Sequence, residues 1–313
     1  YRNLHVTNKV GTAFDTSISS DWGLTGMGVD ISRVSIRSNN LGDRGRTTIN
    51  FFLEHRFYLF NKKVDITPGI AANHFSDFGM HSFPGIDLGW QLNPKLRLYG
   101  NSGTTFRIPT FTDLFYSDRS TVGNADLEPE EALSNEIGVR YTSPKVNVSL
   151  AFYSRKAKNL IDYVKNSNDD IIPFKAENIQ QVNSKGIDFE LTHRIQVYSL
   201  NHEFKISYSY LENNLENSGY NFSRYSINND LKHHFVGSYY FPIYKNLTTN
   251  FVYKFVERTF GDGYSVMDAS VRWTLKQLEV SLYFNNIFNT KYWESNLVPM
   301  PKGNGLLGFR YSF

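Results

Sequence analysis

VNVSLAF, residues 146–152, alternates apolar and polar side chains almost one by one. Its even-numbered positions carry Val, Val, Leu and Phe, whereas Asn147 and Ser149 lie between them. In an extended strand, successive side chains point to opposite faces, so this spacing gives one apolar and one polar face. A helix would need apolar residues three or four positions apart. The stretch therefore predicts a β-strand with two chemically different faces.

The same alternation recurs along the chain, at residues 187–192, 203–210, 280–285 and 309–313. No segment keeps a 3.6-residue period, so any helices should be short pieces within loops. No apolar run reaches the roughly 18 residues of a transmembrane helix. Aromatic residues make up 16% of the chain, which favours strands and is typical of the aromatic girdles of membrane barrels. The sequence predicts an all-β protein.

The connections between the predicted strands alternate between short and long. Short turns are expected at 61–63, 93–95, 143–145, 242–246 and 276–277. Longer polar connections are expected at about 38–45, 107–130, 157–182, 213–228 and 287–303, with 77–81 as a short loop on the long side. An up-and-down meander with tight turns at one rim and functional loops at the other gives this rhythm.

About fifteen strands of about 10–14 residues fit between these connections, long enough to cross a bilayer at a tilt. A soluble sandwich or barrel would also alternate, but its strands are usually nearer 5–6 residues. Strand length and loop asymmetry together favour a transmembrane antiparallel up-and-down β-barrel. Its polar face would line a hydrated lumen, and its apolar face would contact outer-membrane lipid.

Charge and cysteine content exclude several function classes. There are 33 Lys and Arg against 30 Asp and Glu, too even a balance to indicate a nucleic-acid partner. The chain has no cysteine, which excludes disulfides, thiolate catalysis and thiolate metal sites. It begins at Tyr1 in strand-like sequence without a signal peptide. We expect it to be part of a longer polypeptide.

Several blocks make the sequence resemble the barrel of TonB-dependent outer-membrane receptors. Around the middle these blocks are FRIPT at 106–110, DLF at 113–115, GNADLEPE at 123–130 and EIG at 136–138. Near the end they are NNIFNTKY at 285–292 and the terminal Gly308-x-x-Tyr311-x-Phe313. Their order and spacing to the C-terminus match the family.

This resemblance implies a 22-stranded barrel preceded by a plug domain that contacts TonB. Residues 1–313 would be the C-terminal portion of one such barrel domain, with about 15 of the strands and without the plug. The remaining N-terminal part of the same receptor, the TonB complex and a chelate or other small molecule would be its partners. The resemblance implies a Gram-negative outer membrane and active import of a large scarce nutrient, of the ferric siderophore or cobalamin class. A passive porin and a barrel-scaffolded binding protein are the alternatives.

Aromatic and cationic residues in the long connections are the candidate ligand contacts, because binding sites are usually aromatic-lined with a few polar groups. These residues are Phe115, Tyr116, Arg119, Tyr220, Phe222, Arg224 and Tyr225. Girdle or loop packing is the alternative role for the aromatic ones. Tyr292, Trp293 and Lys302 raise the same question in the last long connection.

The acidic residues Asp126, Glu128 and Glu130 are spaced two apart and could in principle supply oxygen ligands to a cation. They lack the order and the glycine of an EF-hand. A structural role at the start of a strand is therefore the favoured interpretation. The eight histidines show no metal-ligand spacing, and no Gly-x-Ser-x-Gly elbow is present. We expect no metal site, no cofactor and no catalytic residue.

Overall fold

The computed structural model describes residues 3–169, 171–216, 219–223, 231–259, 261–294 and 298–313. These residues form seventeen strands and one short helix. The elements are β1 (His5–Ser20), β2 (Gly23–Ser38), β3 (Gly42–Leu59), β4 (Val64–Phe75), β5 (Gly79–Asn93), β6 (Leu96–Arg107), α1 (Phe111–Phe115), β7 (Thr121–Val122), β8 (Glu130–Thr142), β9 (Val146–Lys165), β10 (Phe174–Val197), β11 (Leu200–Glu216), β12 (Phe222–Ser223), β13 (Leu231–Tyr244), β14 (Leu247–Arg258), β15 (Tyr264–Leu275), β16 (Leu278–Asn285) and β17 (Asn304–Tyr311).

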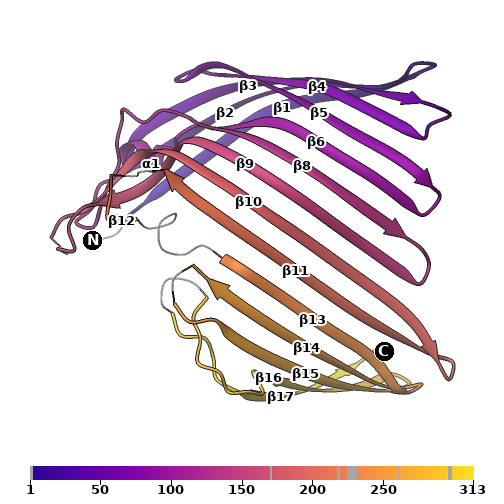
Figure 1. Ribbon diagram of the computed structural model, residues 1–313. Coiled ribbons are helices and arrows are strands. Elements are labelled where there is room, and N and C mark those ends of the chain that lie inside the picture. The colour runs from indigo at the N-terminus through magenta and orange to yellow at the C-terminus, as the bar shows by residue number, and fades with distance from the viewer. Residues whose placement is uncertain (1–2, 170, 217–218, 224–230, 260, 295–297) are drawn as a thin grey trace. The chain divides into compact units, whose positions relative to one another are not determined.

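The strands belong to one sheet, and consecutive long strands pair antiparallel. The register shifts near Gln91 in the β5–β6 pair and near both ends of the β13–β14 pair. Fifteen strands have eight residues or more, and β7 and β12 have two each. The predicted all-β meander of about fifteen strands is confirmed, and α1 is a short piece within a loop, as expected. Figure 1 shows β1 to β6 side by side.

Among the described residues, no helix is long and apolar enough to cross a membrane.

The tight turns lie where the sequence predicts them, and three of the long connections are shorter than expected. The turn at Asn61 adopts a left-handed φ of 54°, which Asn tolerates better than most residues. The connections at 107–130 and 287–303 are confirmed. The prediction of a connection over 157–182 is wrong, since β9 continues to Lys165 and β10 begins at Phe174.

The connections at 38–45 and 213–228 shrink for the same reason, since β2, β3 and β11 extend into them. Several strands are accordingly longer than the predicted 10–14 residues, and β10 reaches 24. The many polar residues in these spans predicted loops. Backbone hydrogen bonds extend a hairpin whatever the polarity of its side chains.

The two faces of the sheet differ in chemistry, as the alternation requires. On β5, Ile86 and Leu88 are exposed on one face, and Asp87 lies between them on the other. The polar face also carries the ion pair between Arg97 and Asp65, at 2.7 Å. We call the face that carries Ile86 and Leu88 the apolar face, and the opposite one the polar face.

The chain divides into two compact units. The first contains residues 1–137, 153–185 and 213–228, and the second contains 138–152, 186–212 and 229–313. Within the first unit, a hydrophobic cluster lies beneath α1 rather than inside a sheet sandwich. It consists of Leu114, Leu127, Ile161, Tyr163 and Ala176. This cluster packs the long connection 108–129 against the ends of β9 and β10.

Candidate functional site

The long connection after β6 begins with a short, fully capped helix. Thr110 is the N-cap of α1: its hydroxyl accepts a hydrogen bond from the backbone N–H of Asp113 at 3.1 Å. The Asp113 carboxylate in turn accepts one from the backbone N–H of Thr110 at 2.9 Å. This reciprocal capping box satisfies donors that a helix start leaves free. The FRIPT block therefore ends one strand and starts one helix.

Arg107, the last residue of β6, closes this connection at its base. Its guanidinium donates to both carboxylate oxygens of Glu130, at 2.8 and 2.6 Å, and to Asp113 at 3.2 Å. The two-pronged contact with Glu130 matches the fork geometry that makes Arg–carboxylate pairs strong. Because Glu130 begins β8, the ion pair joins the two ends of the connection 108–129.

Glu130 and Asp113 are also bonded to β9. The backbone N–H of Ile161 donates to Glu130 Oε1 at 2.7 Å, and the Tyr163 hydroxyl donates to Asp113 Oδ1 at 3.2 Å. Both carboxylates are largely buried, at 10% and 12% side-chain exposure. We call Arg107, Asp113, Glu130 and Tyr163 the loop clasp. Its partners satisfy buried charge, and it fixes the loop to the wall.

Glu128 and Glu130, two of the three acidic residues at 126–130, form hydrogen bonds with different partners. Glu130 belongs to the loop clasp. The Glu128 carboxylate accepts from the Asn159 amide at 2.9 Å, and the Asn178 side chain bonds both the N–H and the carbonyl of Glu128. Within the described part of the chain, no group of three His, Cys, Asp or Glu side chains is arranged to hold a metal ion.

Phe115 and Tyr116 are two of the predicted ligand contacts. Phe115 is held by Arg44 of β3, and Tyr116 by two polar side chains outside the strands. The Arg44 guanidinium lies 3.9 Å from the centre of the Phe115 ring, which also packs against the hydrophobic cluster. The Tyr116 hydroxyl donates to Asp118 at 3.0 Å and accepts from Asn3 at 3.1 Å. Both side chains thus contribute to loop packing, the alternative role that the sequence left open.

The segment after Tyr116 is fixed by side chains that form hydrogen bonds to its backbone groups. The Asn40 side chain donates to the Ser117 carbonyl at 2.7 Å and accepts from the Ser117 N–H at 3.1 Å. Asp118 Oδ1 accepts from the N–H groups of Ser120 and Thr121, each at 2.7 Å. These hydrogen bonds to the ionised form, that of Ser120 foremost, lower the pKa of Asp118. Arg119 is exposed and forms no ion pair with the described residues.

The second group of predicted contacts lies beside the end of β9. Phe222 and Ser223 form β12, which pairs antiparallel with Lys165 and Val164. The Asn221 side chain donates to the Asn166 carbonyl at 3.1 Å.

Tyr220 precedes this bridge and is half-buried. Arg224 and Tyr225, predicted as contacts of the same loop, lie outside the described residues.

One hairpin end holds both loops. On β10, Phe174 and Lys175 pair with β7 of the connection 108–129, in parallel. On β9, Lys165 pairs with Phe222 of the second connection. The structure therefore attaches the Phe115–Tyr116 segment and the Tyr220–Phe222 segment to the outer ends of the same two strands. The cation of Lys165 also lies 4.7 Å from the centre of the Phe174 ring.

The last long connection, in the second unit, is fixed by Asn286. Its N–H donates to Asp268 at 2.7 Å, its amide donates to the carbonyls of Thr290 and Pro301, and its side-chain oxygen accepts from Thr290. Asn286 is 3% exposed and has a left-handed φ of 48°. The NNIFNTKY block thus contains a loop anchor.

Beyond this anchor, Tyr292 stacks on Tyr264 with the ring centres 4.7 Å apart, and the Lys254 cation lies 5.4 Å from the Tyr292 ring. Trp293 is half-exposed in an isolated bridge with Pro299, and Lys302 is exposed. Tyr292 therefore packs against β14 and β15, whereas Trp293 exposes half of its surface.

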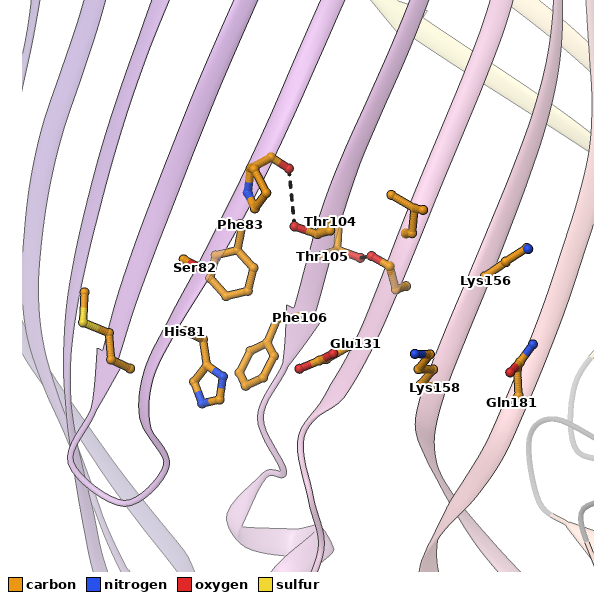
Figure 2. A pocket seen from close by; sticks show the side chains of 14 residues that line it. His81, Ser82, Phe83, Thr104, Thr105, Phe106, Glu131, Lys156, Lys158 and Gln181 are labelled. Atoms are coloured by element: carbon orange, nitrogen blue, oxygen red, sulfur yellow. Dashed lines mark hydrogen bonds between the residues drawn. The ribbon is translucent and has the colours of Figure 1, made fainter.

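A pocket of about 680 Å³ lies where the loop-bearing ends of β5, β6, β8, β9 and β10 meet. Figure 2 shows the Phe106 ring against His81 and Phe83, with ring centres 4.0 and 5.5 Å apart, and Lys156 and Lys158 across the pocket. Sequence reasoning missed this pocket. The signal was present as Lys156-x-Lys158 on a strand, but the span was interpreted as the start of a loop.

The sequence also missed the loop clasp, although Arg107 and Glu130 both fall in the blocks that carry the family resemblance. Their ion pair joins residues 23 positions apart in the sequence, and only the fold shows that they lie within hydrogen-bond distance. The signal available was one of charge: a lone Arg at the end of a strand and a Glu at the start of the next.

Comparison with known families gives a match over most of the chain. The family model described as "TonB dependent receptor-like, beta-barrel" matches residues 1–287.

Curated relatives match shorter segments. The chain is 28% identical over 127 residues to a vitamin B12 transporter BtuB of Vibrio vulnificus, covering 41% of this chain and 20% of the transporter. It is 30% identical over 147 residues to a BtuB of Photobacterium profundum, covering 46% of this chain and 23% of that protein. The matches thus span about a fifth of the relatives' length.

Solved structures share the fold over nearly the whole chain. The siderophore receptor PirA from Acinetobacter baumannii superposes with a TM-score of 0.77 at 14% identity, over 99% of this chain and 55% of that one. A ferric enterobactin receptor mutant from Pseudomonas aeruginosa gives 0.78 at 13% identity, over 99% of this chain and 54% of that one. The chain thus spans about half the length of these receptors, and at such low identity the likeness concerns the fold alone.

Proposed function

Because this chain belongs to the TonB-dependent receptor β-barrel family, we propose that it is the C-terminal portion of the barrel of a receptor that binds and actively imports a large scarce nutrient. Membership places it in the outer membrane of a Gram-negative bacterium, as a transmembrane β-barrel. The barrel domain would comprise residues 1–313 together with the remaining N-terminal strands, to about 22 in all. A plug domain outside this chain would contact the TonB complex.

The nutrient would be of the ferric siderophore or cobalamin class. The relatives that support this are named as vitamin B12 transporters, and the structural neighbours as siderophore and ferric enterobactin receptors. These are transporters and receptors, and no bond chemistry is needed for their role. The protein would supply affinity at its loops, and the energy would arrive through the plug.

The observation that carries the proposal is the attachment of two aromatic loops to one hairpin end. Tyr220 and Phe222 lie beside β9, next to a connection that the loop clasp holds against the same hairpin. A prepositioned aromatic surface loses little conformational freedom on binding a bulky ligand. The packing of Phe115 against Arg44 favours a supporting role for that ring. Tyr220 and Phe222, with Arg224 and Tyr225 of the same loop, are the proposed contacts.

Uptake by the full-length receptor tests the function. Cells carrying the receptor would be given radiolabelled cobalamin and, separately, ferric siderophores, with and without a functional TonB complex. Accumulation that requires TonB supports active import. Accumulation of small solutes without TonB, together with ion conductance of the purified receptor, would instead identify a passive porin. Binding without any accumulation would identify a barrel-scaffolded binding protein.

A matched pair of variants tests the contact residues. In the full-length receptor, replacement of Tyr220 and Phe222 by Ala should weaken nutrient binding by about tenfold or more, since each aromatic contact contributes on the order of 1 kcal/mol. The control is Tyr198→Ala, because Tyr198 is 96% exposed at the turn between β10 and β11. Unchanged affinity in the double variant would move the ligand site away from this loop.

A further inference from the structure

Two cations lie on one face of β14, in the second unit. Lys254 and Arg258 both fall on even-numbered positions, as Asn250 does, and side chains two positions apart on a strand share a face. Phe251 lies on the opposite face, together with Trp273 of β15, which is 45% exposed. The two cations are therefore on the side of this part of the sheet that carries polar residues.

Glu294, in the last long connection, is bonded to both cations. Its carboxylate forms an ion pair with the Lys254 ammonium, and its backbone carbonyl accepts a hydrogen bond from Arg258 at 2.9 Å. Glu294 thus presents two oxygens to two cations, as a bound anion would. The side chains of Lys254 and Glu294 are 27% and 41% exposed, so water reaches the pair. A partly exposed ion pair holds its partners weakly and can exchange one carboxylate for another.

Two stacked tyrosine rings lie beside the same ammonium. The ring centres of Tyr264 of β15 and Tyr292 are 4.7 Å apart, and Lys254 Nζ is 5.8 and 5.4 Å from them. At these distances an ammonium is attracted to a tyrosine ring. Ligand sites combine aromatic walls with a few polar or charged groups. An anionic molecule that carries rings would find both kinds of contact here.

The base of the last long connection is fixed independently of this ion pair. Asn286 holds it through the hydrogen bonds described above, and Thr290 Oγ1 donates to the Ser265 carbonyl at 2.7 Å. Glu294 lies four positions beyond Thr290. Exchange of the Glu294 carboxylate for another anion therefore leaves the anchored part of the connection in place.

We propose that Lys254, with Arg258 beside it, is an anion subsite for the imported nutrient, and that Glu294 occupies it as an internal competitor until the nutrient displaces its carboxylate. The inference rests on the proposed import function and narrows the nutrient to an anionic chelate, such as a catecholate or carboxylate complex of iron. Tyr264 and Tyr292 supply the aromatic wall. Because the competitor is tethered, its effective concentration at Lys254 is high. Its removal therefore strengthens the binding of anions and leaves the binding of neutral molecules unchanged.

Titration of the full-length receptor in detergent tests the subsite. The probe is citrate, a small polycarboxylate, and triethyl citrate is its uncharged counterpart. Glu294→Gln should bind citrate about fivefold more tightly, a factor at the upper end of what a partly exposed ion pair contributes. Lys254→Met should bind citrate about tenfold more weakly, because it removes a charged hydrogen-bond donor. In the unaltered receptor, citrate should also speed hydrogen exchange over residues 290–294, since it displaces the Glu294 carboxylate.

Matched variants from other ion pairs of the same unit make the test specific. Glu279→Gln breaks the pair with Arg272, and Lys205→Met breaks the pair with Glu203. Both should leave citrate affinity unchanged, because neither pair lies beside Tyr264 and Tyr292.

Three results would overturn the proposal. The first is equal citrate affinity in Glu294→Gln and the unaltered receptor. The second is binding of triethyl citrate as tight as that of citrate, and the third is hydrogen exchange over residues 290–294 that citrate does not change.

The outcome is distinguishable from that of the uptake experiment. TonB-dependent uptake of cobalamin, combined with an unchanged citrate affinity in Glu294→Gln, would leave import standing and remove the anion subsite. The expected citrate results without TonB-dependent uptake of any nutrient would remove import and leave an anion subsite at Lys254.

Discussion

Arg107 and Glu130, at the two ends of a 22-residue connection, are joined by two hydrogen bonds of 2.8 and 2.6 Å. The pair converts a long surface loop into a closed ring of chain whose ends are fixed. Asp113 and Tyr163 attach that ring to β9. The loop is therefore attached to the strands of the sheet, and one guanidinium joins its two ends.

Replacing Arg107 by Ala should release the connection 108–129. The change leaves Glu130 and Asp113 largely buried without their cation, at a cost of about 1–3 kcal/mol in the free energy of loop opening. Limited proteolysis in detergent should show faster cleavage within 108–129. Arg119→Ala is the control, because Arg119 lies in the same loop and is exposed. Equal cleavage of the two variants would show that the clasp does not hold the loop.

Replacing Asn286 should separate two contributions to the last long connection. Asn286→Ala loses the side-chain hydrogen bonds and keeps a left-handed φ, so it should destabilise the loop by about 2–4 kcal/mol. Asn286→Gly loses the same bonds without the backbone strain and should cost about 1 kcal/mol less. Hydrogen exchange over residues 287–294 measures both. Identical exchange in the two variants would exclude the strain contribution.

The turn at Asp118 should depend on pH in the acidic range. Its pKa is lowered by hydrogen bonds to the ionised form, so its stabilising effect is complete above the ordinary Asp pKa of about 3.9. That effect should be lost as the pH falls through the lower, folded-state pKa. Proteolysis of the loop by an acid-active protease between pH 2 and 5 should show this loss. Asp118→Asn should abolish the pH dependence, and a persisting dependence would point to another group.

Replacing Phe115 by Ala should affect loop order more than ligand affinity. The ring packs against Arg44 and the hydrophobic cluster, so its loss should cost about 1–3 kcal/mol of local stability. The expected result is faster proteolysis of residues 108–129. Nutrient affinity should stay within about threefold of that of the unaltered receptor. A large affinity loss with unchanged proteolysis would make Phe115 a ligand contact.

Local patterns in the sequence predicted most of the fold, because a strand with two different faces needs only its own residues to be recognised. The alternation at 146–152 and the turn at Asn61 are examples. The outer ends of β9 and β10 were missed because apolar and polar side chains do not alternate there, as the adjacent Tyr163 and Val164, both buried, show. Their pairing depends on backbone bonds with β7 and β12, which are distant in sequence.

The contacts that support the candidate site could not be predicted, because contact residues and supporting residues look alike in sequence. Phe115 and Tyr220 are both loop aromatics, and only the fold shows Arg44 stacked on the first. Glu130 looked like one of three acidic neighbours until Arg107 was placed beside it. Partners far apart in the chain decide such roles, and no local pattern reports them.

The parallel pairing of β7 with β10 has a consequence for how such a receptor can change over time. Thr121 and Val122 pair with Phe174 and Lys175, so these two surface segments must keep a common register. An insertion in one would shift its partner. Insertions and deletions should therefore be tolerated better in the loop residues outside 121–122 and 174–175. New binding preferences would have to arise in those other loop residues.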